Sequence, residues 1–285
     1  NFPGEQVVFK MSTVSDGSHE IFLCNINPSQ PASWHTPKAD HIRIIGTDVL
    51  PQVLSNSIES QKGIVIQGTQ GEQSAGITVS DCDYWEIAGV DFVEVSAGIF
   101  TFKNNWGGME EHSTDNWYVH NNRVYTFYRE SGMQFNGDNN HIVNNEIYKV
   151  TNRVDTPYGC QLLNILGDHN IILGNTLSQK ESTADCVGIR FEWDLADSNL
   201  VGRNFIYDVI AGIDIEGGDN NIIRNNIIFR RNKPAPYHAG IEIKSHNEKM
   251  TGWPCDETVG TAPALLPPNN PAHPDYHHYF EPRNC

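Results

Sequence analysis

The segments HNIILGNTLS (169–178), SNLVGRNFIYD (198–208) and NNIIRNNIIF (220–229) share the pattern from which we predict the fold. Each has an Asn, two or three apolar residues, a short spacer, a second Asn, and an apolar residue two positions later. The second Asn recurs after steps of 23, 30, 29 and 22 residues. The copies begin at Asn116, Asn140, Asn170, Asn199 and Asn221, and their second Asn residues are Asn122, Asn145, Asn175, Asn204 and Asn226.

A glycine that opens another apolar-alternating run follows each copy. In every run Ile, Val or Phe alternates with polar residues, which predicts short strands with one buried face. A period of this length predicts stacked coils, and the Gly and Asn breaks exclude helical repeats. The glycines are Gly98, Gly132, Gly159, Gly188, Gly212 and Gly240, and we expect Gly63 to begin the series.

The repeated Asn has a physical reason to lie at a bend. Asn tolerates left-handed backbone, and its amide can bond to the equivalent Asn one coil away. We therefore predict that four of them stack in one internal column, Asn145, Asn175, Asn204 and Asn226.

These repeats resemble those of the pectate-lyase-like right-handed parallel β-helix superfamily over roughly residues 60–246. The superfamily contains polysaccharide lyases, inverting glycoside hydrolases, uronate epimerases, esterases and non-catalytic surface proteins. The resemblance implies an all-β solenoid and leaves the activity open. We expect residues 1–246 to form this β-helix, with an N-terminal cap and first coil over 1–60. Residues 247–285, rich in Pro and His, are expected to pack on it as an irregular tail, because so short a segment has no core of its own.

Composition narrows the partners and the compartment. The formal charge is −16, which disfavours nucleic acid as a partner. No apolar stretch reaches the roughly 18 residues of a membrane span. The chain begins at Asn1 without a charged-then-apolar leader, so we expect a mature, secreted or periplasmic monomer.

Six cysteines, none in a CxxC pair, favour disulfides over a structural zinc site. We expect Cys255 to pair with Cys285, and the alternative is buried free thiols.

The Gly-opened strands are expected to carry the site. We align GIFTF (98–102), GMQFN (132–136), GCQLL (159–163), GIRFE (188–192), GIDIE (212–216) and GIEIK (240–244). The residue after each Gly is apolar and faces the core, so the next one points outward. The first outward column reads Phe100, Gln134, Gln161, Arg190, Asp214 and Glu242, and the second reads Phe102, Asn136, Leu163, Glu192, Glu216 and Lys244.

Four acids and two bases meet at one end of these columns. Stacked neighbours are about 4.8 Å apart, and residues i and i+2 about 6.6 Å. A solvated charge ladder would pair Arg190 with Asp214. The like-charge stacks Glu192 on Glu216 and Asp214 on Glu242, however, need a cation or a shared proton, which favours a functional site. As solvent-facing residues, Asp214 and Glu216 should be replaceable by Ala with loss of activity and little change in melting temperature.

This patch predicts a Ca²⁺-assisted lyase that cleaves a uronic-acid-containing polysaccharide by β-elimination. The superfamily's lyases use acids to hold the ion and a Lys or Arg as base, so by position Arg190 or Lys244 would be the base. The mixed charges favour this chemistry. The resemblance assigns Ca²⁺ to Glu192, Asp214, Glu216 and Glu242.

Three alternatives stay open. A hydrolase would use the carboxylates of Asp214 and Glu216 as an inverting pair, or Glu192 and Glu216 as a retaining pair. This chain lacks the adjacent Asp-Asp and the Gly-His-Gly of the pectin-cutting β-helix hydrolases. An epimerase and a non-catalytic adhesin are the other two. The residues expected to bind the sugar are Gln134, Asn136, Gln161, Trp193 and His238.

Overall fold

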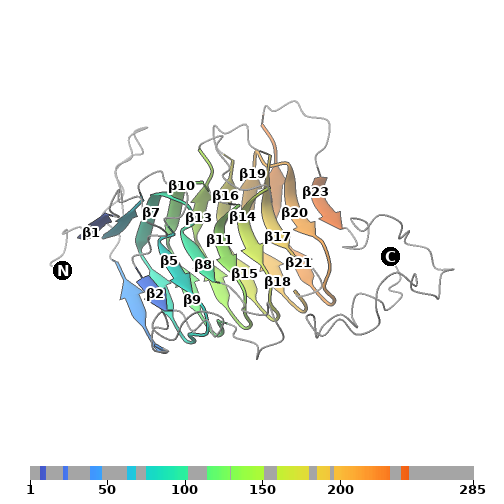
Figure 1. Cartoon of the computed structure of the whole chain (residues 1–285). Helices are drawn as coiled ribbons and strands as arrows, with labels where there is room; N and C mark the ends of the chain where they lie inside the picture. The colour runs from blue at the N-terminus through green and yellow to red at the C-terminus, as the bar shows by residue number, and fades with distance from the viewer. Residues whose placement is uncertain are drawn as a thin grey trace, which may run out of the picture.

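The computed structural model of the chain describes residues 7–10, 22–24, 39–46, 63–68, 75–101, 114–128, 130–150, 159–179, 185–192, 196–231 and 239–243. These residues form three parallel sheets and contain no helix. Each turn of the chain adds one strand to each sheet in the same order, as β10 (Arg123–Phe127), β11 (Ser131–Phe135) and β12 (His141–Val143) do. The protein is a right-handed parallel β-helix, and its strands follow one another along the axis from the blue to the orange end (Figure 1).

We refer to the three sheets as A, B and C. Sheet A consists of β1 (Val7–Lys10), β4 (Ile64–Gln67), β7 (Val90–Val95), β10, β13 (Glu146–Tyr148), β16 (Thr176–Ser178), β19 (Phe205–Tyr207) and β22 (Ile227–Phe229). Sheet B consists of β2 (Phe22–Cys24), β5 (Ile77–Val79), β8 (Ile99–Thr101), β11, β14 (Cys160–Ile165), β17 (Cys186–Phe191), β20 (Ala211–Ile215) and β23 (Ala239–Ile243). Sheet C consists of β3 (Arg43–Ile45), β6 (Glu86–Ala88), β9 (Tyr118–His120), β12, β15 (Ile171–Leu173), β18 (Leu200–Gly202) and β21 (Ile222–Arg224).

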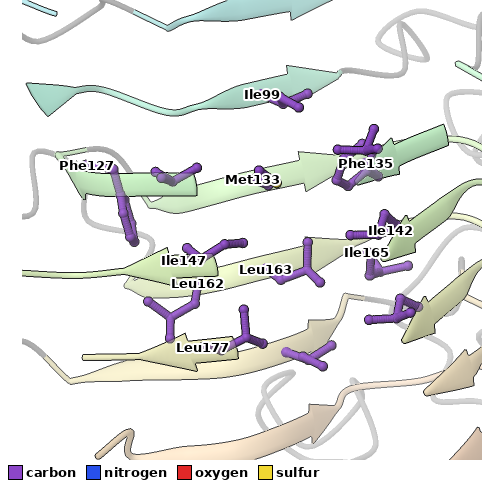
Figure 2. Packing of buried hydrophobic residues seen from close by; sticks show 14 of the residues in the cluster. Ile99, Phe127, Met133, Phe135, Ile142, Ile147, Leu162, Leu163, Ile165 and Leu177 are labelled. Carbon is purple, nitrogen blue, oxygen red and sulfur yellow. The ribbon is translucent and has the colours of Figure 1, made fainter. Parts of the chain in front are cut away.

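The core is a set of apolar columns that run between the sheets. Ile142 of sheet C, Ile147 of sheet A and Met133 of sheet B are fully buried and come from one stretch of the chain. Figure 2 shows how such residues from successive strands fill the interior, with Leu162, Leu163 and Leu177 in the next layers. Because every coil has the same inward positions, the apolar period of the sequence becomes a continuous core.

The predicted asparagine column is confirmed. The backbone N–H and the Nδ2 group of Asn145 both donate to Oδ1 of Asn175, at 2.9 and 3.1 Å. Asn175 bonds in the same way to Asn204, and Asn204 to Asn226. The column also includes Asn122, which donates to Asn145. The residue before each of these asparagines has a positive φ, as at Asn144 (54°) and Gly174 (68°), so the connection from sheet C to sheet A is a tight, repeated corner.

Two positions of the repeat differ from the prediction. The first-Asn column runs through Asn140, Asn170, Asn199 and Asn221, but its preceding member is Trp117 rather than Asn116. Asn116 has a φ of 60° and lies at the left-handed position one residue earlier. Gly63 does not begin the Gly series, because the strand that follows it, β4, belongs to sheet A. The equivalent glycine is Gly76, since Ile77 pairs with Ile99.

Disulfides are confirmed within the described residues, which hold no free cysteine. Cys160 and Cys186 lie opposite each other on β14 and β17 and are bonded, with Cα atoms 4.4 Å apart. Cys82 is also disulfide-bonded. The predicted Cys255–Cys285 pair and the tail over 247–285 lie outside the described residues. Of residues 1–60, predicted as an N-terminal cap and first coil, only 7–10, 22–24 and 39–46 are described, and they hold β1, β2 and β3. The described chain also contains no helix that is long and apolar enough to cross a membrane.

Candidate functional site

The outer face of sheet B carries a row of polar side chains at one strand position. Gln134 on β11 pairs with Asn164 on β14, and Asn164 pairs with Arg190 on β17. Arg190 pairs with Asp214 on β20, which pairs with Glu242 on β23. Figure 1 shows these five strands side by side. We call this row, which runs from two amides through a cation to two acids, the polar column.

Asn164, rather than Gln161, is the member of the polar column on β14. Leu163 pairs with Met133 and Ile189 and is fully buried in the core, so the prediction that it points outward is wrong. The predicted column position of Gln161 is also wrong, because Gln161 pairs with Ser131 rather than with Gln134. The cause is Leu162, which occupies on β14 the place that Gly132 and Gly188 occupy on the adjacent strands. An alignment that begins at Gly159 is therefore shifted by three residues.

The second column is confirmed for Asn136, Glu192 and Glu216. The backbone N–H of Glu216, just after β20, donates to the Phe191 carbonyl, so Glu216 follows the ladder and lies next to Glu192. On β14 the corresponding residue is Leu166, whose N–H donates to Phe135 in the same way.

The polar column points away from the core but is not open to solvent. Arg190 is 8% exposed, Asp214 2% and Glu216 1%. Only Glu192 and Glu242 among the acids are half-buried. The expectation that Asp214 and Glu216 lie on the solvent face is therefore wrong. Substitution of either one must change stability as well as any chemistry.

At its amide end the column is held by a local hydrogen-bond network. The backbone N–H of Asn136 donates to the Thr101 hydroxyl oxygen at 2.6 Å, and the Nδ2 group of Asn136 donates to the Thr101 carbonyl at 3.1 Å. The Ser131 hydroxyl lies 3.4 Å from Oε1 of both Gln134 and Gln161. Gln161 is thus buried at the entrance of β14, three residues before the polar column, and its side chain contacts the Ser131 hydroxyl.

Arg190 is the charged centre of the site. Its Nη2 forms an ion pair with Oε2 of Glu216. Burial lowers the pKa of Arg190, but the hydrogen bond to Glu216 and the charges of Glu192, Glu216 and Asp214 outweigh it and raise the pKa overall. A guanidinium held in this way stays protonated. Its surroundings favour a cation that binds an anion over a base that removes a proton.

Calcium binding was predicted at Glu192, Asp214, Glu216 and Glu242. Within the described residues no group of three or more His, Cys, Asp or Glu side chains is arranged to hold a metal ion. Glu216 is also engaged by Arg190. These residues therefore do not fit a Ca²⁺ site as they stand, and calcium stays a prediction.

A column of aspartates follows sheet B and was not predicted from the sequence. Oδ1 of Asp138 accepts the backbone N–H of Asp168 at 2.7 Å, and Oδ1 of Asp168 accepts that of Asp197 at 2.7 Å. The signal was readable, because an Asp stands two residues before each Asn of the first column. The full column is Asp40, Asp83, Asp115, Asp138, Asp168, Asp197 and Asp219. Each carboxylate from Asp40 to Asp197 accepts the backbone N–H of the next aspartate in the column, one coil on, which makes this column a structural device.

Chain connections of variable length border sheet B. From β9 onward the corner from sheet C to sheet A is short and regular, as between Val143 and Glu146 or between Leu173 and Thr176. The connection that enters sheet B ranges from three residues before β20 to eleven before β14. Binding sites on rigid scaffolds are built by such variable segments. Three predicted site residues, Trp193, His238 and Lys244, fall outside the described residues.

Comparison with known proteins leaves the function to be argued from these residues. No family model matches the chain, and no curated protein matches it. Among solved structures it is similar to the A-module of the mannuronan C-5 epimerase AlgE6 from Azotobacter vinelandii. The identity is 10% and the TM-score 0.23, over 84% of this chain and 91% of that chain. Similarity this weak carries no argument about activity.

Proposed function

We propose that the protein cleaves a uronic-acid-containing polysaccharide bound along the outer face of sheet B. The observation that carries the proposal is the polar column, in which Gln134, Asn164, Arg190, Asp214 and Glu242 succeed one another on adjacent strands. Parallel strands repeat about every 4.8 Å, so the column is a line of donors and acceptors along the solenoid axis. A polymer of hydroxyl-rich units matches such a line better than a compact ligand does.

Arg190 supports an anionic sugar. The protein carries a formal charge of −16, so a negatively charged polymer needs a local cation to bind. Arg190 is kept protonated by the acids around it, and a guanidinium suits a carboxylate in size and geometry. Neutralising the sugar carboxylate is also the first requirement of β-elimination, because it acidifies the adjacent C–H.

The proposed reaction is β-elimination, with Arg190 binding the uronate carboxylate and Lys244 as the proposed base. Approach from the side of Glu192 and Glu242 is favoured, since these acids keep the most exposure in the site.

Hydrolysis is the second candidate, and the buried acids favour it. Asp214 and Glu216 are two residues apart on one face, which places their Cα atoms about 6.6 Å apart. That spacing is compatible with the roughly 6.5–9.5 Å between the carboxyl groups of an inverting pair. Both side chains are almost fully buried, and Glu216 is ion-paired with Arg190, so in this reaction Asp214 would be the general acid and Glu216 the general base.

One set of assays separates the two reactions. Polygalacturonate, polymannuronate and neutral glucans would be incubated with the protein, and both new reducing ends and ultraviolet absorbance of unsaturated ends would be followed. Elimination gives both signals, whereas hydrolysis gives reducing ends alone. Lys244→Ala should abolish the absorbance signal, and Glu146→Gln, on sheet A, is the matched control that should not.

The same assay with EDTA tests the calcium prediction. Loss of activity that added Ca²⁺ restores would support the ion, and full activity in EDTA would remove it. Absence of any cleavage by the wild-type protein, over the whole substrate set, would refute the proposed function.

A further inference from the structure

The amide of Asn164 has a fixed orientation. Its Nδ2 group donates to Oε2 of Glu192 at 2.6 Å and to Oε1 of Gln134 at 3.2 Å. Both partners are acceptors, so the nitrogen must face them and Oδ1 must face away. Oδ1 is buried and accepts no hydrogen bond from the described residues, while the whole residue is 1% exposed.

Arg190 presents the complementary feature on the next strand. It pairs in register with Asn164, and its Nη2 bonds to Glu216. Its Nε–H is buried and donates to no acceptor among the described residues. The site therefore places one unused acceptor and one unused donor on directly neighbouring outward positions. Buried polar groups are nearly always hydrogen-bonded, so this pair points to a ligand.

A hydroxyl group fits both atoms. A carboxylate or a carbonyl can only accept, and an ammonium can only donate, but a hydroxyl accepts from one neighbour and donates to another. We propose that Asn164 and Arg190 form a hydroxyl subsite, in which Arg190 Nε–H donates to a sugar hydroxyl and that hydroxyl, or its vicinal neighbour, donates to Asn164 Oδ1. This inference rests on the proposed function, and it specifies the chemical group of the polymer, a hydroxyl, that the buried site binds.

The subsite separates two roles of Arg190. The Nη2 group holds Glu216, whereas Nε is the atom proposed to bind the sugar hydroxyl. Arg190→Lys keeps a cation for Glu216 but has no Nε–H at that place on the side chain. This variant therefore removes the proposed ligand contact while preserving the charge.

Binding of hexa-oligosaccharides of galacturonic acid, mannuronic acid and glucose would be measured by calorimetry. For the oligosaccharide that the wild type binds, Arg190→Lys should weaken binding by on the order of 10- to 100-fold, the usual effect of losing a charge-assisted hydrogen bond. Glu146→Gln is the matched control and should bind as the wild type does. Urea midpoints of the variants would verify that each is folded.

The outcomes distinguish the two proposals. Wild-type binding with unchanged affinity in Arg190→Lys would overturn the hydroxyl subsite and leave the proposed function standing. No binding by the wild type to any of the three oligosaccharides would overturn both. If Arg190→Lys does not fold, a crystal structure of the wild type with the oligosaccharide decides. A sugar hydroxyl within hydrogen-bond distance of Arg190 Nε and Asn164 Oδ1 supports the subsite, and a water molecule there beside the bound sugar refutes it.

Discussion

Glu216→Ala is expected to destabilise the fold by roughly 3 kcal/mol, because it leaves the buried guanidinium of Arg190 without its ion-pair partner. Glu216 is 1% exposed and Arg190 8%, so water cannot replace the lost carboxylate. Breaking a buried pair on one side usually costs about 3–5 kcal/mol. The lower end applies here, since the charges of Glu192 and Asp214 also act on Arg190.

Removing both charges should cost less than removing one. In the double variant Arg190→Met with Glu216→Leu, no uncompensated charge remains, and the apolar pair fills a similar volume. We expect it to be more stable than Glu216→Ala. The coupling free energy from Arg190→Met, Glu216→Leu and the double variant should be at least about 1.5 kcal/mol.

Urea denaturation followed by circular dichroism measures these differences through the midpoint, with the slope checked for constancy. A loss below about 0.5 kcal/mol for Glu216→Ala, the range of exposed surface positions, would refute the burial argument. The result also governs enzymology at this site. Activity of a Glu216 variant is interpretable only at a temperature where that variant is folded.

Three further results are expected. Asn175→Ala removes the acceptor of the Asn145 N–H and the donor to the Ile142 carbonyl, so it should lower the free energy of unfolding by about 2–4 kcal/mol. Asn226→Ala, at the end of the same column, should lower it by about half as much. Equal losses for the two variants in urea titrations would contradict the column. Burial, and then the nearby Asp carboxylates, raise the pKa of Asp168, so its ionised form costs stability above the unfolded pKa of about 4. Asp168→Asn should therefore raise the melting temperature by about 2–4 °C at pH 7, with the gain gone near pH 3, and a gain that persists in acid would show another cause. Reduction of the Cys160–Cys186 disulfide, which closes a 26-residue separation, should cost roughly 3 kcal/mol, and an unchanged urea midpoint in dithiothreitol would contradict this.

The architecture could be predicted because each coil repeats the same constraint. A tight corner needs a left-handed residue and a side chain that satisfies buried backbone groups, and Asn meets the second need at Asn145, Asn175 and Asn204. Because each corner has this requirement, the Asn recurs in the sequence once per coil. From these repeated residues we predicted that the strands exist, the order in which they follow one another, and that Arg190 and Asp214 point away from the core. The structure confirms these predictions.

The register of β14 could not be predicted from these repeated residues. Its neighbours carry a glycine at one inward place, where a Cβ on Gly132 would lie 2.6 Å from Ile147 Cγ2 and 2.8 Å from the Leu162 carbonyl oxygen. β14 carries Leu162 there, and the only nearby glycine, Gly159, is three residues early. The shift hid Asn164, and it also hid the disulfide, because it set Cys160 opposite Ile189 rather than Cys186.

The sequence repeat could not predict that the outward-pointing side chains of sheet B are buried. Alternation predicts which side chains point away from the core, but it carries no information on what covers them. From the sequence, the polar column is therefore interpreted as a charge ladder on the surface. In the structure, however, Asp214 and Glu216 are among the most buried acids of the described residues. The like-charge stacking was the one sequence feature that hinted at a special environment.

Because the corner between sheets C and A is regular, the number of coils fixes the distances along the solenoid axis. Every coil advances the chain by one strand spacing, about 4.8 Å, whatever the length of the segments beside sheet B. The distance from Gln134 to Asp214 is thus set by the number of coils between β11 and β20, and not by loop sequence. Deleting one whole coil, for example residues 170–198, would keep the ladders in register. It would also remove Arg190 and Cys186, and it would place Asn164 beside Asp214, so that the amide and acid ends of the site lie one strand spacing closer. Substrate length preference would then be a countable property of the fold, changeable one rung at a time.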